Sequence, residues 1–195
     1  KMLGWLSLTL VFITLLVFGV RYYFAKQIVD DWENISAEKK KEIHVDCLNL
    51  FYNYQNQTAQ FSYQIIRNRK LVNAFSSQNT RKAYESLYEN ENVNDFNIEI
   101  YNSRLELFLF SGRQVNPDIT ELKKALGGER YSTVKEVGIY SYILVFDPIK
   151  NDSGKTDGVL VTSRLLDINS EVETRFFNSA GIKKEIFEKY HIDVL

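Results

Sequence analysis

The sequence contains little cysteine and histidine, and each shortage excludes a class of protein. A single cysteine, Cys47, allows no internal disulfide, so the chain is not a small secreted domain held together by disulfides. With two histidines there is no catalytic triad and no HExxH zinc helix, and no glycine-rich phosphate-binding loop is present. His44 and Cys47 lie one helical turn apart but are too few ligands for zinc. We therefore expect no catalytic residue, no metal and no cofactor in these residues.

A large excess of charge of one sign is also missing. The chain has 24 Lys and Arg residues against 25 Asp and Glu residues, which gives a formal net charge of −1. Proteins that bind nucleic acid need a basic face to neutralise phosphates. The composition therefore argues against nucleic acid as a partner.

Glycine and proline are both absent between residues 20 and 111. These residues interrupt helices most strongly, so their absence over this length predicts one long helix over residues 21–73. The alternative is a break near residues 35–37, where Ser36 followed by Glu38 can start a new helix. A second helix is predicted over residues 79–89, with Asn79 or Thr80 as its N-cap.

The long helix carries apolar residues on two faces. A helix that is apolar on two faces packs against two neighbours. We expect one neighbour to be the chain's own folded domain and the other to be a second copy, which gives a homodimer through the long helix. The first stripe is Ile43, Cys47, Leu50, Tyr54, Phe61 and Ile65, and the second is Val45, Leu48, Phe51 or Tyr52, and Ile66.

Residues 2–20 contain no charged side chain. A helix of this length crosses the roughly 30 Å of hydrocarbon in a bilayer. Trp5 at one end and Tyr22, Tyr23 and Phe24 at the other match the aromatic residues found at membrane interfaces. The alternative, a cleaved signal peptide, would end in small residues before a cleavage site, and none follows here. The sequence predicts a transmembrane anchor over residues 1–25, with the lipid bilayer as a partner.

The orientation of this anchor does not follow from charge alone. Arg21 and Lys26 follow the span and Lys1 precedes it, so a charge count puts the C-terminal side in the cytoplasm. Long domains, however, are translocated largely regardless of charge.

From residue 96 onward the pattern changes to short apolar runs separated by polar turns. Phe96, Ile98 and Ile100 alternate with Asn97 and Glu99, which predicts a half-buried strand with the two polar residues on the outer face. The further strands predicted are residues 105–110, 130–137, 139–146 and 158–166, the last two forming a hairpin.

A short helix is predicted over residues 119–126, between the second and third strands. Asp118 is its expected N-cap, and Gly127 and Gly128 are expected to end it. The predicted fold class is α+β: the N-terminal transmembrane helix continues into the long helix, and a meander-like, five-stranded antiparallel sheet follows with helices on one face.

This order of elements resembles the Cache family of extracytoplasmic sensor domains, which have a PAS-like sheet. The phrases that carry the resemblance are IEIYNSRLELFLFSGR, LKKALGGERYSTV and GIYSYILVFDPIKNDSGKTDGVLVTSRLL, and it covers residues 28–167. The Tyr, Arg and Asp constellation with a neighbouring Trp, expected of the amino-acid-binding subgroup, is not recognisable. The resemblance implies that the folded part lies outside the inner membrane and that residues 111–130 cover a ligand cavity.

The expected organisation has four parts. They are an anchor over residues 1–25, the long helix plus a second helix over 26–95, a PAS-like sheet domain over 96–167, and a linking helix with the start of a further strand or module over 168–195. The chain begins on Lys1 and ends on the apolar run HIDVL, so we expect it to be the N-terminal piece of a longer protein.

Tyrosine and arginine side chains gather in the predicted strands and in the segment that covers the cavity. Such side chains suit a small anionic ligand through hydrogen bonds and charge. The alternative is that the tyrosines belong to the core and that the arginine of the turn is simply exposed. The candidate ligand-binding residues are Arg113, Tyr131, Tyr140, Tyr142 and Arg164.

These predictions favour the sensing half of a membrane receptor, most simply a sensor histidine kinase of a two-component system. The sheet domain would bind a small molecule or a protein partner and move helices relative to the membrane, and any kinase active site would lie beyond Leu195. A pilin-like structural subunit is an alternative, but residues 2–20 lack the Glu that filament-forming pilins carry there. A membrane-anchored binding or adhesion module without cytoplasmic output is another.

Overall fold

The fold is described in a computed structural model that covers residues 2–90, 92–151, 153–168 and 181–190. The side chains of residues 2–14, 30, 33, 183 and 187 lie outside the description as well. The chain divides into two compact units, Lys1–Asp46 and Cys47–Leu195. The first contains the N-terminal part of helix α1, and the second contains all the other elements.

Helix α1 runs over Met2–Arg67, and no break occurs near residues 35–37. Within the residues described, none of the helices is apolar over a stretch long enough to cross a bilayer. Most of the predicted span, residues 2–14, lies outside the described side chains, so the anchor stays a prediction.

The predicted end of the long helix near residue 73 is wrong. Helix α1 stops at Arg67, and Asn68 then caps α2 (Arg69–Ser76) by accepting hydrogen bonds from the backbone N–H groups of Lys70 and Leu71. Helix α3 (Thr80–Tyr88) follows, and its N-cap is Asn79, as predicted. Helices therefore end at asparagine caps here without any glycine or proline.

Five antiparallel strands form one sheet in the order β2-β1-β5-β4-β3. The prediction of a meander is wrong, because β5 lies between β1 and β4 in the centre of the sheet. The β4–β5 hairpin is confirmed, and in its turn the side-chain oxygen of Asn151 accepts hydrogen bonds from the backbone N–H groups of Ser153 and Lys155. The strands are β1 (Asn97–Asn102), β2 (Leu107–Ser111), β3 (Tyr131–Val137), β4 (Tyr140–Lys150) and β5 (Thr156–Ile168).

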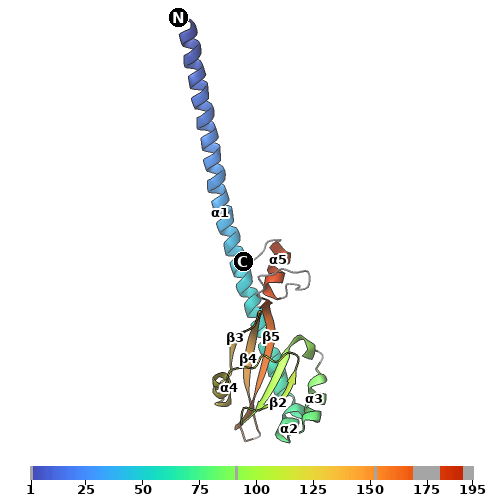
Figure 1. The fold of residues 1–195 in the computed structure, drawn as a ribbon. Coiled ribbons are helices and arrows are strands. Elements are labelled where there is room, and N and C mark those ends of the chain that lie inside the picture. Colours follow the sequence, from blue (N-terminus) through green and yellow to red (C-terminus); the bar gives the residue numbers. More distant parts are fainter. Residues whose placement is uncertain (1, 91, 152, 169–180, 191–195) are drawn as a thin grey trace. The chain divides into compact units, whose positions relative to one another are not determined.

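The prediction that helices cover only one face of the sheet is also wrong. The C-terminal part of α1 with α2 and α3 packs on one face, and α4 (Ile119–Leu126) packs on the other (Figure 1). Strand residues alternate between the two faces, so neighbours such as Val159 and Leu160 belong to different core clusters. The sheet is therefore the middle layer of three.

Each face of the sheet has its own apolar core. The core beneath α1, α2 and α3 includes the stacked rings of Phe61 and Phe96, with centroids 4.2 Å apart. The core beneath α4 includes Leu122 and Ala125 of that helix together with Leu144 and Phe146 of β4. Burial of these side chains at about 25 cal/mol per Å² supplies most of the stabilisation of this layered arrangement.

Beyond the sheet, helix α5 (Ile182–Tyr190) lies within residues 168–195, where a linking helix was predicted. Its Ile186 is fully buried, and Glu185 accepts a hydrogen bond from the Tyr54 hydroxyl of α1 at 2.5 Å. Residues 169–180 and the predicted further strand, residues 191–195, lie outside the described residues.

Candidate functional site

The α4 face of the sheet is covered by the segment between β2 and β3. This cover segment consists of the loop of residues 112–118, helix α4, and the turn of residues 127–130. Asp118 is the N-cap of α4 as predicted, and the Glu121 carboxylate accepts a hydrogen bond from the Asp118 backbone N–H at 2.9 Å. Gly127 is the C-cap, and Gly128 follows with a φ of +99°, a conformation that glycine adopts without strain. The predicted helix bounds are confirmed.

A buried carboxylate holds the loop of the cover segment to the sheet. Glu99 of β1 is only 2% exposed. It accepts hydrogen bonds from the backbone N–H of Val115 at 2.6 Å and of Asn116 at 3.3 Å, and from the Tyr101 hydroxyl at 2.5 Å. Burial raises the pKa of Tyr101 well above its ordinary value, and the hydrogen bond to Glu99 and the charge of Glu99 add to this. The prediction that Glu99 lies on the outer face is wrong, because the cover segment lies over that face.

Three of the predicted ligand-binding residues meet at the start of the cover segment. The guanidinium of Arg113 lies 4.1 Å from the centre of the Tyr140 ring, and Arg113 Nη1 lies 3.4 Å from the Tyr142 hydroxyl. Tyr142 is buried, whereas Arg113 is exposed. Among the residues described, no carboxylate lies within ion-pair distance of Arg113. The arrangement therefore presents an exposed guanidinium, held against a buried phenol, that can donate to an anion.

A second cation lies on the neighbouring strand. Lys135 of β3 is directly opposite Tyr142 in the register of the sheet, and its side chain therefore lies on the same face. Its ammonium group binds the Asn116 carbonyl at 2.8 Å and the Asp118 carboxylate at 3.0 Å. Lys135 was not predicted as a site residue. Residues two apart in a strand lie on the same face, so its position two residues before Val137 could have indicated the face on which it lies.

Tyr131 lies on the same face but is bound to helix α4 rather than to Arg113. Its ring stacks on Phe146 with centroids 4.7 Å apart, and its hydroxyl donates to the Glu121 carbonyl at 2.8 Å. Burial raises the pKa of Tyr131 to about 12, and the charges of Glu121 and Glu129 contribute. Tyr131 therefore anchors the end of the cover segment.

Arg164 lies on the opposite face of the sheet. Its guanidinium stacks over the Tyr54 ring at 4.0 Å and binds the Gln57 side chain, so it contacts α1. The prediction grouped Arg164 with the other four residues, but side chains along a strand alternate between its two faces, and Arg164 lies on the α1 face. Arg164 takes no part in the cluster around Arg113.

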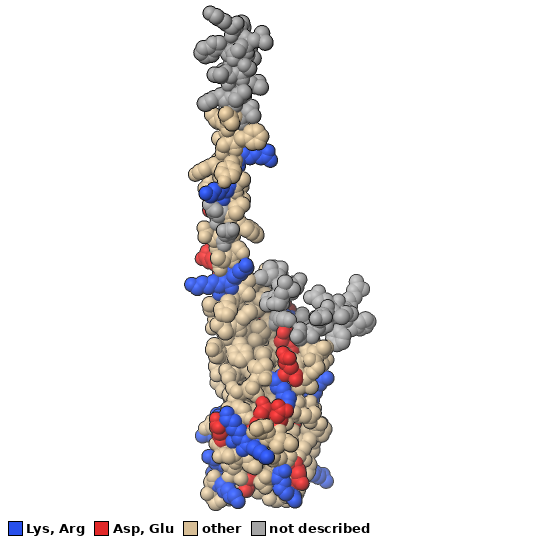
Figure 2. All heavy atoms as spheres, turned by 60° about the vertical axis from the view of Figure 1, so that its left-hand side comes forward, with Lys and Arg blue, Asp and Glu red and all other residues tan. Residues whose placement is uncertain are grey.

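Neither the void beneath α2 nor the surface charge of the face in Figure 2 marks a ligand position. A void of about 10 Å³ under α2 is lined only by apolar side chains, among them Ile65, Phe75 and Leu160, and is too small for a ligand. On the face shown in Figure 2, acidic and basic side chains are intermixed rather than gathered by sign.

Neither the known protein families nor the curated proteins contain a match to the chain.

Proposed function

We propose that the chain is the extracytoplasmic sensing region of a membrane receptor and that it binds a small anionic ligand at the cluster of Arg113, Tyr140 and Tyr142. The observation that carries the proposal is the exposed guanidinium held against two tyrosine side chains at the edge of the cover segment. A guanidinium fork matches a carboxylate or phosphate in geometry. Small carboxylates and phosphates are the ligand class that fits.

The receptor assignment requires that ligand binding at this site is linked to the movement of a helix. A ligand that binds one of two conformations tenfold more tightly shifts their equilibrium by about 1.4 kcal/mol. The uninterrupted helix α1 is the element through which such a shift would reach the membrane. The output domain, for which a histidine kinase is the expectation, would lie beyond these residues, and the Cache resemblance supports this assignment.

We also propose that the chain forms a homodimer through the second apolar stripe of α1. Val45, Leu48 and Tyr52 follow a helical spacing and are 46%, 42% and 56% exposed. Apolar side chains at such a spacing gain from burial against a second copy. The oligomeric state of the full chain in detergent, compared with that of Leu48→Glu, tests this: a dimer that the substitution does not weaken would contradict it.

A thermal-shift measurement tests the ligand proposal. The full chain is heated with acetate, succinate, citrate, glutamate or inorganic phosphate, at an ionic strength matched with sodium chloride. An anion present at a hundred times its dissociation constant adds nearly 3 kcal/mol of stability. We expect at least one of these anions to raise the unfolding temperature above that in sodium chloride.

Variants locate the binding. Arg113→Gln removes the guanidinium and is expected to weaken binding by about 10- to 100-fold, because hydrogen bonds to charged groups contribute about 1.5–3 kcal/mol. Tyr142→Phe should weaken it less. Arg104→Gln is the matched control, since Arg104 is exposed in the β1–β2 turn and pairs with Glu106. The proposal fails if no anion stabilises the chain, or if Arg113→Gln keeps the full shift.

A further inference from the structure

Two adjacent residues at the start of β3 join the two faces of the sheet. Strand β3 is an edge strand, and it begins directly after the turn that ends the cover segment. Tyr131 is held on the α4 face by its stacking on Phe146 and its hydrogen bond to Glu121. Arg130, the residue before it, turns to the opposite face and contacts α1. The end of the cover segment is therefore fixed to both layers that flank the sheet.

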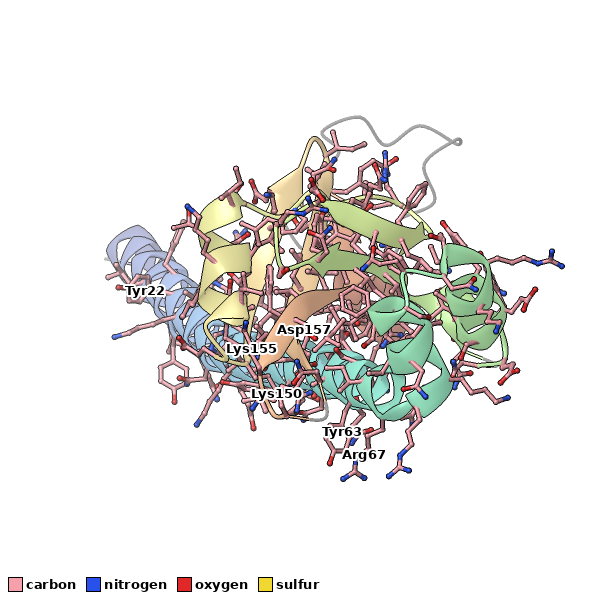
Figure 3. The ribbon with its side chains drawn as sticks, turned by 90° about the horizontal axis from the view of Figure 1, so that it is seen from below. Tyr22, Tyr63, Arg67, Lys150, Lys155 and Asp157 are labelled. Carbon is pink, nitrogen blue, oxygen red and sulfur yellow. The ribbon has the colours of Figure 1, made fainter. Side chains whose placement is uncertain are left out.

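Arg130 makes three contacts on the α1 face. Its Nε forms an ion pair with the Asp147 carboxylate at 2.7 Å, and its Nη2 donates to the Ala59 carbonyl at 2.8 Å. Its guanidinium also lies 5.7 Å from the centre of the Tyr63 ring. Tyr63 lies beside Arg67 on the outer side of α1, as Figure 3 shows. One side chain thus contacts two successive turns of α1.

The carboxylate that Arg130 binds is buried between the sheet and α1. The Asp147 side chain is 5% exposed, and its second oxygen accepts a hydrogen bond from the buried Ser62 hydroxyl of α1 at 2.5 Å. Burial raises the pKa of Asp147, and the contacts to Ser62 and Arg130 oppose this. A buried carboxylate has to keep its partners, because an unpaired buried charge is strongly unfavourable. Arg130, Asp147 and Ser62 must therefore move together.

We infer that Arg130 is a positioning residue that couples the cover segment to α1. A displacement of the end of α4 moves Arg130. The ion pair to Asp147 and the hydrogen bond to Ala59 then transmit this displacement to α1. This inference assigns a route for the signal of the proposed function and rests on that function for its biological meaning. The coupling itself requires no ligand and can be measured without one.

Amide hydrogen exchange of the full chain tests the coupling. Gly128→Ala displaces the end of α4, because its φ of +99° strains any residue with a Cβ, while the nearest atom to that Cβ is Thr156 Oγ1 at 3.9 Å. The substitution is made alone and together with Arg130→Gln. Exchange is followed in three peptides: residues 119–126 of α4, residues 54–66 of α1, and residues 97–102 of β1 as the measure of global stability.

Coupling predicts a specific pattern. Gly128→Ala alone should speed exchange in the α4 peptide and, by about threefold or more, in the α1 peptide, with little change in β1. In the Arg130→Gln background it should speed exchange in the α4 peptide only. Arg130→Lys, which can pair with Asp147 but cannot also reach Ala59 in the same way, should restore only part of the effect on α1.

Three results would overturn the inference. The first is an unchanged α1 peptide in the Gly128→Ala chain whose α4 peptide has accelerated. The second is an equal acceleration of all three peptides, and the third is an acceleration of the α1 peptide in both backgrounds. Either of these last two means that Arg130 has no more than a structural role. A chain that shows this coupling but binds none of the tested anions would refute the proposed ligand site and leave the coupling standing.

Discussion

Gly158 of β5 lies where two other groups approach too closely for a side chain. A Cβ at this position would lie 2.4 Å from the Tyr101 carbonyl oxygen and 2.5 Å from Cζ of Phe75. The carbonyl belongs to the paired strand β1, so it cannot move without disturbing the ladder. A glycine is required here by the packing of the sheet against α2.

Gly158→Ala is accordingly expected to lower the free energy of unfolding by about 1–3 kcal/mol, the usual cost of overpacking a core. Chemical denaturation of the full chain measures this. Gly19→Ala is the control, because nothing lies within 4 Å of its added Cβ and its backbone is helical. Equal stability of the Gly158→Ala and wild-type chains would contradict the close approach.

Tyr54 links α1 to α5 because its hydroxyl donates a hydrogen bond to Glu185, and its pKa is raised. Burial, the hydrogen bond to Glu185 and the charge of Glu185 together raise the pKa of Tyr54 from 10.0 to about 12, although the charge of Arg164 opposes them. In the unfolded chain the phenol ionises near pH 10. The contribution of Tyr54 to stability is therefore complete below pH 10 and is lost as the pH rises towards 12.

Glu185→Gln should lower the pKa of Tyr54 and so reduce the loss of stability between pH 10 and pH 12. The unfolding midpoint, together with tyrosine absorbance at 295 nm, gives both quantities. Glu188→Gln, an exposed change on the same helix, should leave the alkaline slope unchanged. If both variants show the wild-type slope, the Tyr54–Glu185 hydrogen bond has no effect on stability.

At the scale of elements, the capping residue Asn68 marks the division between α1 and α2. Asn68 accepts hydrogen bonds from the N–H groups of Lys70 and Leu71, donates to the Ser86 carbonyl and accepts from the Ser86 hydroxyl. These contacts start α2 and also fix α3 against it. The cap therefore joins two short helices that pack on the sheet.

Asn68→Ala should lower the free energy of unfolding by about 1 kcal/mol, as the loss of an N-cap usually does. Asn73→Ala is the matched control: Asn73 is exposed within α2, where alanine is the better helix former. Thermal unfolding followed by circular dichroism compares the two. A smaller loss for Asn68→Ala than for Asn73→Ala would contradict the capping role.

Composition and periodicity predicted most elements but not their arrangement. The strands, the β4–β5 hairpin and the caps at Asn79 and Asp118 could be predicted because alternation, turn residues and capping residues act locally. The end of α1 was missed because the absence of glycine and proline was weighted above the capping residue Asn68. The central place of β5 was missed because strand pairing depends on long-range packing that a local pattern does not contain.

At the scale of the whole molecule, the candidate site follows from which face of the sheet each residue occupies. Arg113, Tyr140 and Tyr142 were grouped by the sequence and do meet, whereas Arg164 lies on the other face. Glu99 was placed outside because an alternating strand gives no sign of a segment that later covers its polar face. To predict which residues form a site, it is therefore necessary to know which segment covers each face of the sheet.

The account as a whole requires that the sheet domain lies outside the membrane to which the chain is anchored. Labelling of a cysteine with a membrane-impermeant maleimide in intact bacterial spheroplasts tests this most directly. The single native cysteine is removed by Cys47→Ala, and Ser153→Cys adds one in the exposed β4–β5 turn. The account predicts that the chain sediments with membranes and is labelled fully before lysis, whereas the cysteine-free chain stays unlabelled. Labelling only after lysis, or recovery of the chain free of membranes, would contradict it.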